Sequence, residues 1–293
     1  MATSHRNGCA RKEVLRSGPA REKLKTIGAL SPRRACGLAD FWEHRYLVYV
    51  FVWRDVRARY KQTLLGALWA VLQPLLTMAV FTFVFQRLAK IPSEHVSYPV
   101  FVLCGLLPWQ FFAQAVARSG NSLVSERYLL TRVFVPRVIV PVSAVLSGLP
   151  DLGVALGASF GVMLFYGVVP RLTFLLAVPF LLLMVGLAMA VGLFLSSLNA
   201  RFRDVSYLVP FLIQLWFFIT PVAYPSTLVP AKWRSLYFVN PVAPLVEGFR
   251  AALTGNTPIP PNRIIVSVAS VCVSLLVGFV YFHWSEERFA DVV

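Results

Sequence analysis

The chain has 293 residues, of which 57% are hydrophobic and only 14% are charged. Soluble globular domains carry about a quarter charged residues, so this composition excludes a soluble domain and indicates an integral membrane protein. The net charge of +15 would suit a nucleic-acid partner, but half of the 28 Lys and Arg residues lie in residues 1–63, beside the first long apolar run. Charge in that position is typical of topology signals and of contact with anionic membrane lipid, and no nucleic-acid-reading motif accompanies it.

The cysteines are widely separated, and no two of them form a Cys-x-x-Cys pair. Two lie in the basic N-terminal region and two in apolar stretches (Cys9, Cys36, Cys104 and Cys272). This spacing predicts neither a metal site nor a disulfide framework.

The N-terminal region divides into two parts. Residues 1–40 are basic, contain scattered Gly and Pro and lack an apolar run, so we expect a disordered cytoplasmic tail. In residues 41–63 the unbroken apolar stretch covers only Leu47 to Trp53, whereas a membrane span needs about 20 residues. Aromatic residues beside Arg and Lys are typical of an amphipathic helix that lies in the membrane interface. The alternative is a buried strand or helix that packs against a soluble partner.

Six later stretches are long and apolar enough to cross a hydrocarbon core of about 30 Å. They cover residues 64–86, 99–117, 138–167, 172–198, 206–224 and 264–284. Pro141, Pro150 and Pro210 fall inside these stretches, where neighbouring helices satisfy the freed carbonyls, so we expect kinks rather than breaks. The predicted fold class is an all-α integral membrane protein, in which residues 41–293 form one membrane domain with six transmembrane helices.

The distribution of basic residues predicts the orientation of these spans. If the N-terminus is cytoplasmic, the cytoplasmic segments hold 21 Lys and Arg residues and the external segments hold 7. Lys and Arg close to a span stay on the cytoplasmic side. We therefore expect both termini of this multi-pass protein to lie in the cytoplasm.

A dense basic cluster runs directly into the first span. It consists of Arg54, Arg57, Arg59 and Lys61, and Leu65-Gly66-x-x-Trp69 and Gln73-Pro74 follow it. This sequence resembles the permease subunits of ABC type-2 polysaccharide exporters, which move O-antigen, teichoic acid and capsule precursors. The resemblance implies a homodimer of permeases with two separate ATP-binding subunits, and a lipid-linked glycan as the substrate. The basic cluster is then a candidate contact for the lipid head at the cytoplasmic entrance.

The chain contains no phosphate-binding loop of the G-x-x-x-x-G-K-[ST] type. It therefore does not bind ATP by that route, and no grouping of acidic or nucleophilic residues suggests a hydrolase or glycosyltransferase. We expect a transport subunit without catalytic residues or cofactors of its own, whose partner ATPase binds ATP and Mg²⁺.

Residues 121–137 predict a short amphipathic cytoplasmic helix. Asn121 suits its N-cap, Glu126 its first turn, and Pro136 its end. The resemblance implies that this is the coupling helix that docks on the ATPase, and the alternative is a plain surface helix. The turn at 199–205 is a smaller candidate for the same contact. The predicted coupling residues are Asn121, Glu126, Arg127, Tyr128, Arg132, Arg201 and Arg203.

Residues 225–262 are predicted to lie on the external side of the membrane and to contain two short helices, re-entrant or interfacial, separated at Asn240-Pro241. The pattern N-P-x-x-P-L-x-E-x-x-R resembles the external gate helices of the exporter family. Glu247 and Arg250 lie three residues apart on one helix face, so a local ion pair is the alternative to a gating role.

Two aromatic clusters lie in different spans. The first is Trp109, Phe111 and Phe112, and the second is Trp216, Phe217 and Phe218. Flat aromatic faces could line a sugar path, but an aromatic belt or a lipid-facing core accounts for the same residues.

Asp151 is the only acidic residue deep within a predicted span, and intramembrane carboxylates are costly and commonly functional. It could relay protons in a secondary transporter. However, it has no basic partner at helical spacing, which favours a carboxylate that faces a cavity or hydrogen-bonds between helices. A membrane scaffold is a further alternative for the whole chain, but a scaffold needs neither external gate helices nor a polar path.

Overall fold

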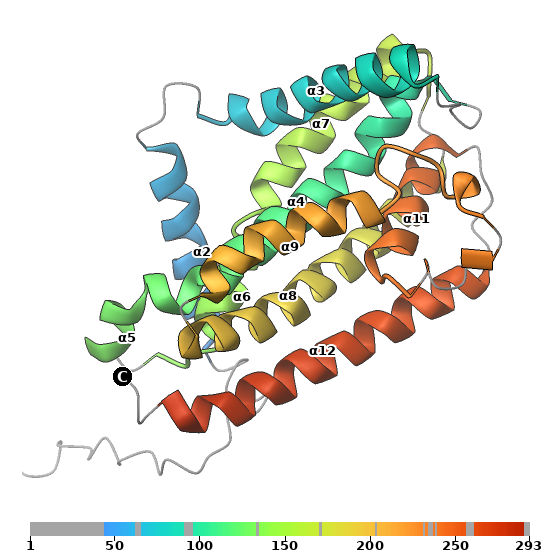
Figure 1. Ribbon diagram of the computed structural model, residues 1–293. Helices are drawn as coiled ribbons and strands as arrows, with labels where there is room; N and C mark the ends of the chain where they lie inside the picture. The colour runs from blue at the N-terminus through green and yellow to red at the C-terminus, as the bar shows by residue number, and fades with distance from the viewer. Residues whose placement is uncertain are drawn as a thin grey trace, which may run out of the picture.

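The computed structural model describes residues 44–61, 66–90, 96–132, 135–169, 172–202, 204–230, 232–233, 237, 239–255 and 261–289. All the regular elements in these ranges are helical, which confirms the all-α class (Figure 1). The predicted tail, residues 1–40, lies outside the described residues.

The helices follow one another in this order: α2 Arg45–Tyr60, α3 Leu68–Phe81 with a π-helical continuation η2 Thr82–Leu88, α4 Tyr98–Ser125, α5 Arg127–Arg132, α6 Ile139–Leu146, α7 Leu149–Phe165, the 3₁₀ turn η3 Leu172–Leu176, α8 Ala177–Arg201, α9 Val205–Ile219, the 3₁₀ turn η4 Ser226–Leu228, α11 Val242–Thr254 and α12 Pro261–Phe289.

Five helical segments in the described ranges are long and apolar enough to cross a membrane. They are Leu68–Leu88, Tyr98–Ser125, Ile139–Phe165, Leu172–Arg201 and Ile264–Ser285. The predicted span 206–224 is represented by α9, which has 15 residues and ends at Ile219. A helix of that length covers only about 22 Å, which is less than the hydrocarbon core. The structure therefore shows five segments long enough to span and one shorter apolar helix in its described residues, and the count of six spans stays a prediction.

The core of the bundle is α4, which contacts α8, α6, α11, α3 and α7. In its most apolar window 78% of the residues are buried, compared with 6% in the first span, Leu68–Leu88. Small residues allow this close packing: the Oγ of Ser119 lies 2.4 Å from the position that a Cβ on Gly192 would occupy. Lipid tails are as apolar as the side chains, so the hydrophobic effect does not drive helices together within a membrane. Close van der Waals packing of this kind drives their association instead.

The third span is divided into α6 and α7 by a turn at Ser147 and Gly148. Pro150 lies in the first turn of α7, where its missing N–H is not needed. A Cβ on Gly148 would lie 2.3 Å from Nη2 of Arg118, so a glycine lets the guanidinium approach the turn. Pro141 lies within α6, and the interruption falls before Pro150.

The two ends of the bundle differ. Helices α2 and α5 and the C-terminal end of α12 lie at one end, whereas α11 lies toward the other (Figure 1). The interfacial segment predicted for residues 41–63 is a helix, α2, which packs on α6 through Val48 and Phe51. This finding excludes the alternative of a buried strand.

Candidate functional site

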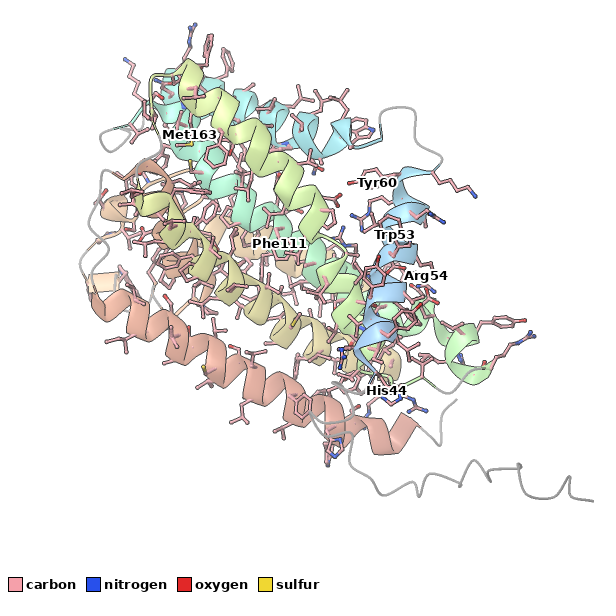
Figure 2. All side chains as sticks on the ribbon, turned by 180° about the vertical axis from the view of Figure 1, so that it is seen from behind. His44, Trp53, Arg54, Tyr60, Phe111 and Met163 are labelled. Atoms are coloured by element: carbon pink, nitrogen blue, oxygen red, sulfur yellow. The ribbon has the colours of Figure 1, made fainter. Side chains whose placement is uncertain are left out.

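A group of polar side chains surrounds the turn between α6 and α7. From α2, the guanidinium of Arg59 donates to the carboxylate of Asp151 and, at 3.2 Å, to the hydroxyl of Ser147. The hydroxyl of Tyr60, the last residue of α2, also donates to Asp151, and its side chain points from α2 toward the bundle (Figure 2). From α4, Nη1 of Arg118 lies 3.9 Å from the same carboxylate. Three helices, α2, α4 and α7, and the turn at Ser147 therefore contribute to one charged cluster.

The surroundings of Asp151 include basic partners that helical spacing in the sequence did not predict. Its carboxylate forms ion pairs with Arg59 and Arg118. It also lies in the first turn of α7, where the positive end of the helix dipole stabilises an anion. Helical spacing in the sequence did not reveal these partners because both come from other helices. Arg118 was missed for a simpler reason: the predicted span ended at residue 117, and α4 continues to Ser125.

Tyr60 keeps its proton in this cluster. Burial raises the pKa of Tyr60 to about 12, with the hydrogen bond to Asp151 as the next cause. The phenol is therefore a hydrogen-bond donor to the carboxylate at neutral pH, and it adds no charge to the cluster.

Two hollows adjoin at the cluster. One is a cavity of about 190 Å³ between α2, α3, α4 and α7, and we call it the recess. The other is a cleft of about 620 Å³ between α2, α4 and α6, whose lining extends to Glu126 at the α5 end of the bundle. Arg59 and Arg118 line both hollows.

Polar residues of α4 follow these hollows at helical spacing. Gln110, Gln114 and Arg118 line the recess, and Asn121 and Ser125 line the cleft. The spacing of three and four residues puts them on one face of α4. This polar stripe was not recognised in the sequence, although glutamines four residues apart in an apolar span are a detectable signal.

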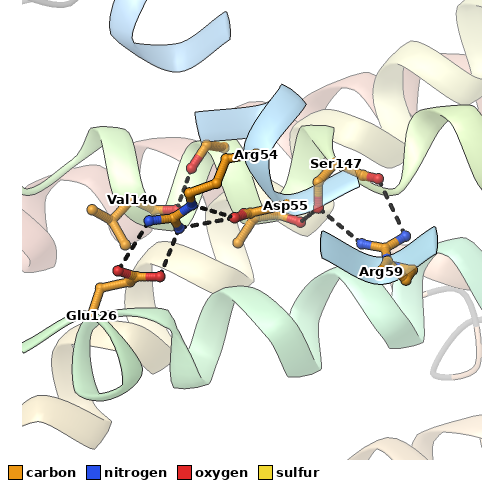
Figure 3. A network of polar contacts seen from close by, with 8 residues as sticks. Arg54, Asp55, Arg59, Glu126, Val140 and Ser147 are labelled. Atoms are coloured by element: carbon orange, nitrogen blue, oxygen red, sulfur yellow. Dashed lines mark hydrogen bonds and ion pairs between the residues drawn. The ribbon is translucent and has the colours of Figure 1, made fainter. Parts of the chain in front are cut away.

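The same helix α2 is held at a second point. The guanidinium of Arg54 donates to Glu126 at 2.6 and 3.2 Å and to Asp55 at 2.9 and 3.0 Å (Figure 3). Arg57 and Lys61 are exposed, and the guanidinium of Arg57 lies 5.5 Å from the ring centre of Trp53. Two of the four basic residues predicted at the entrance, Arg54 and Arg59, therefore form ion pairs, and all four except Arg59 are exposed.

The helix predicted over residues 121–137 has different bounds in the structure. Asn121 lies inside α4, where it accepts a hydrogen bond from Asn199 of α8 at 2.9 Å, so it is not the N-cap of a separate helix. The separate helix is α5, and Glu126 is the residue that links α4 to it. The sequence misplaced the boundary because the span continues past residue 117 without a stop signal.

The polar side chains of helix α5 are exposed on the surface of the bundle. Arg127, Tyr128 and Arg132 are exposed, and the guanidinium of Arg132 lies 4.0 Å from the ring centre of Tyr128. In the neighbouring turn, Arg201 lies over the ring of Phe202 at 5.0 Å. Arg203 lies outside the described residues.

The two aromatic clusters meet each other inside the bundle. Trp109 lies 5.6 Å from Phe217, and Phe112 lies 5.1 Å from Trp216, between ring centres. Trp109 and Phe112 are buried, as is Phe111, whereas Phe218 is 62% exposed. Packing between α4 and α9 accounts for the burial of Trp109 and Phe112, whereas Phe111 lies toward Gly148 and lines the recess.

Two of the predicted gate residues, Asn240 and Arg250, hold the segment that follows α9 to the bundle. Asn240 accepts a hydrogen bond from the indole of Trp216 at 2.8 Å. Arg250 of α11 is buried, donates to the carbonyls of Pro221 and Val222 at 2.7 and 2.8 Å, and covers the ring of Phe101 at 3.7 Å. Glu247 is partly buried on the same helix. Most of the first predicted gate helix, residues 231–239, lies outside the described residues.

Comparison with known proteins identifies the family. A family described as "ABC-2 type transporter" matches residues 46–254, from α2 to the end of α11. The chain belongs to the ABC-2 type transporters. It is a multi-pass transport subunit without a phosphate loop, and this membership decides against the secondary transporter and the scaffold.

Named relatives cover most of this ABC-2 type chain. The O-antigen export system permease protein RfbA of Myxococcus xanthus is 31% identical over 87% of the chain and 98% of its own length. The polysialic acid transport protein KpsM of Escherichia coli is 24% identical over 80% of the chain and 91% of its length. The inner membrane transport permease YadH of Escherichia coli K12 is 26% identical over 72% of the chain and 84% of its length.

We predict that Arg59 and Asp151 stabilise the transporter as a pair. Single Arg59→Gln and Asp151→Asn substitutions should each lower the free energy of unfolding, because each leaves an ionised partner in a part-buried site. The double variant should show a coupling energy of about 1–3 kcal/mol, as for hydrogen bonds between charged groups. Unfolding of the purified chain in mild detergent would measure it.

The matched control is the pair Arg54 and Asp55, whose side chains are 43% and 27% exposed. Solvent screening should keep its coupling energy below about 1 kcal/mol. Equal coupling energies for the two pairs would contradict the special role of the cluster at Asp151.

Proposed function

We propose that this ABC-2 type transporter exports a lipid-linked polysaccharide of the O-antigen, teichoic acid or capsule type across the bacterial plasma membrane. The observation that carries the proposal is the match over 87% of the chain to a permease named for O-antigen export. The match to a polysialic acid transport protein points to the same class of substrate. In the proposed complex, two copies of this chain enclose the path, and two ATP-binding subunits bind ATP and Mg²⁺.

The arrangement of α2 suits the cytoplasmic entrance of such a path. Tyr46, Tyr49 and Trp53 are more than half exposed on α2, and aromatic rings favour the level of the lipid headgroups. Arg57 and Lys61 add exposed positive charge beside them, which attracts a lipid that carries a diphosphate.

The opposite end of the bundle suits an external gate. The buried guanidinium of Arg250 fixes α11 to the carbonyls after α9, so a movement of α9 would move the external segment. Among the aromatic residues predicted for the sugar path, Phe218 has the most exposed surface to offer a passing sugar.

The first test concerns orientation. Single cysteines at Ser125 and Thr227, both exposed positions near opposite ends of the bundle, should react differently with an impermeant thiol reagent in intact cells. We expect labelling at residue 227 only, because the excess of basic residues keeps α5 in the cytoplasm. A cysteine-free background removes the signal of the native thiols, and labelling at residue 125 from outside would reverse the proposed topology.

The second test concerns ATPase docking by α5. Arg127→Glu should lower the yield of the complex or its stimulated ATP hydrolysis, because it reverses an exposed charge on the proposed contact. Insertion of the chain into the membrane should not change. The control is Arg87→Glu, the same exposed charge reversal at the end of η2. Wild-type assembly, hydrolysis and export in the Arg127 variant would favour a plain surface helix.

The third test concerns the substrate. Deletion of the gene should remove one surface polysaccharide and leave its polymer in the cell, and the wild-type gene should restore export. Arg57→Ala should restore it only partly, since loss of one charge-assisted contact to a lipid head costs about 1–3 kcal/mol. Unchanged surface glycans, with loss of efflux of a small drug or a lipid, would show that the transporter carries another substrate.

A further inference from the structure

The carboxylate of Asp151 is bound as a ligand anion would be bound. Arg59 and Arg118 both approach its Oδ2 atom, and Tyr60 donates to Oδ1. The side chains of both arginines are 28% exposed and that of Asp151 is 19% exposed, so all three are shielded but not sealed from the recess. Two convergent guanidinium groups are an arrangement typical of carboxylate and phosphate recognition.

Arg118 has hydrogen-bonding capacity that the described residues do not use. Its Nε atom is buried without a hydrogen-bond partner, and its nearest anion, at 3.9 Å, is too distant for a hydrogen bond. Buried polar atoms are nearly always satisfied, so an unsatisfied guanidinium beside a cavity calls for a partner.

The wall of the recess beyond the two arginines is neutral and polar. Gln73, Gln110 and Gln114 line it, and their amides have no hydrogen-bond partner within the described part of the chain. Trp69 is 52% exposed at the same wall. Amide groups that both donate and accept suit the hydroxyls of a sugar, and a broad indole suits its apolar face. At about 190 Å³, the recess is smaller than the roughly 300–1,000 Å³ of drug-sized ligand sites, so it suits a head group rather than a chain.

We propose that the recess binds the diphosphate and the first sugar of a lipid-linked glycan, and that Asp151 is an internal substitute for this diphosphate. In the empty transporter Asp151 neutralises Arg59 and Arg118. The incoming diphosphate displaces the carboxylate from the two guanidinium groups, and the sugar contacts the glutamines. This inference rests on the proposed function, because a substrate of that class supplies both groups.

The exchange is physically reasonable because each state keeps the arginines neutralised. Two guanidinium groups in a shielded site are costly without an anion, and a single carboxylate supplies only two acceptor atoms. A diphosphate offers more oxygens and more charge, so it can also occupy the donors that Arg118 leaves unused. Tyr60 holds the carboxylate in its place beside the arginines, and the helix dipole of α7 still stabilises Asp151 after the carboxylate is displaced.

The experiment measures binding of farnesyl diphosphate to the full-length chain in lipid nanodiscs. Arg118→Gln should weaken binding roughly ten- to a hundredfold, the range expected for a lost charge-assisted hydrogen bond. Asp151→Asn should strengthen binding by a similar factor because it removes the competing carboxylate. Tyr60→Phe should strengthen it to a smaller extent, since it only loosens that carboxylate. Asp55→Asn, which removes an acid on α2 that contacts Arg54 instead, should bind like the wild type.

Weaker or unchanged binding in both Asp151→Asn and Tyr60→Phe would overturn the exchange, and Tyr60→Phe preserves this test if the Asp151 variant does not fold. Farnesol that binds as tightly as farnesyl diphosphate would show that the tail, not the diphosphate, is recognised. Inorganic pyrophosphate that binds as tightly as farnesyl diphosphate would show a site for a free diphosphate.

The expected binding pattern together with unchanged surface glycans in the deletion strain would support the site and refute the proposed function. Loss of a surface glycan in the deletion strain without the expected binding pattern would refute the binding site and leave the proposed function standing.

Discussion

The need to neutralise charge and to satisfy the backbone inside a low-dielectric layer governs the arrangement of this protein. The third span is interrupted at Ser147, and Arg118 projects from α4 toward that interruption. Polar groups at such depth need partners within the protein or a water-filled cavity. Asp151 and Arg59 supply those partners, and the packing of α2 against the bundle follows from this requirement.

Helix α2 therefore links two parts of the molecule that are distant in sequence. Arg54 holds Glu126, which directly precedes α5, and Arg59 holds Asp151 at the recess. Five residues, or about 1.4 helical turns, separate these two arginines, and a helix is rigid over that length, so we expect a displacement of α5 to reach the recess. The ion pairs on α2 thus connect the surface proposed for the ATPase with the site proposed for the substrate head.

The aromatic residues show how packing and transport compete for the same side chains. In a membrane, apolar rings satisfy either role, and composition alone does not distinguish a buried ring from one that faces a path. The structure buries Trp109, Phe111 and Phe112 between spans and leaves Phe218 exposed. The polar stripe of α4 lines the hollows at the charged cluster, and Phe111 is the one member of the two aromatic clusters that also lines them.

The sequence by itself determined the helical membrane class, the family, the helix at 41–63 and most of the spans, because apolar length and charge near span ends act locally along the chain. It misplaced the end of α4 by eight residues, from 117 to Ser125, because polar residues continue a helix wherever they face a polar hollow. Only the tertiary structure decided the partners of Asp151 and the position of Arg118. Those contacts join three helices, α2, α4 and α7, and their sequence separation of up to 92 residues, between Arg59 and Asp151, leaves no periodic signal.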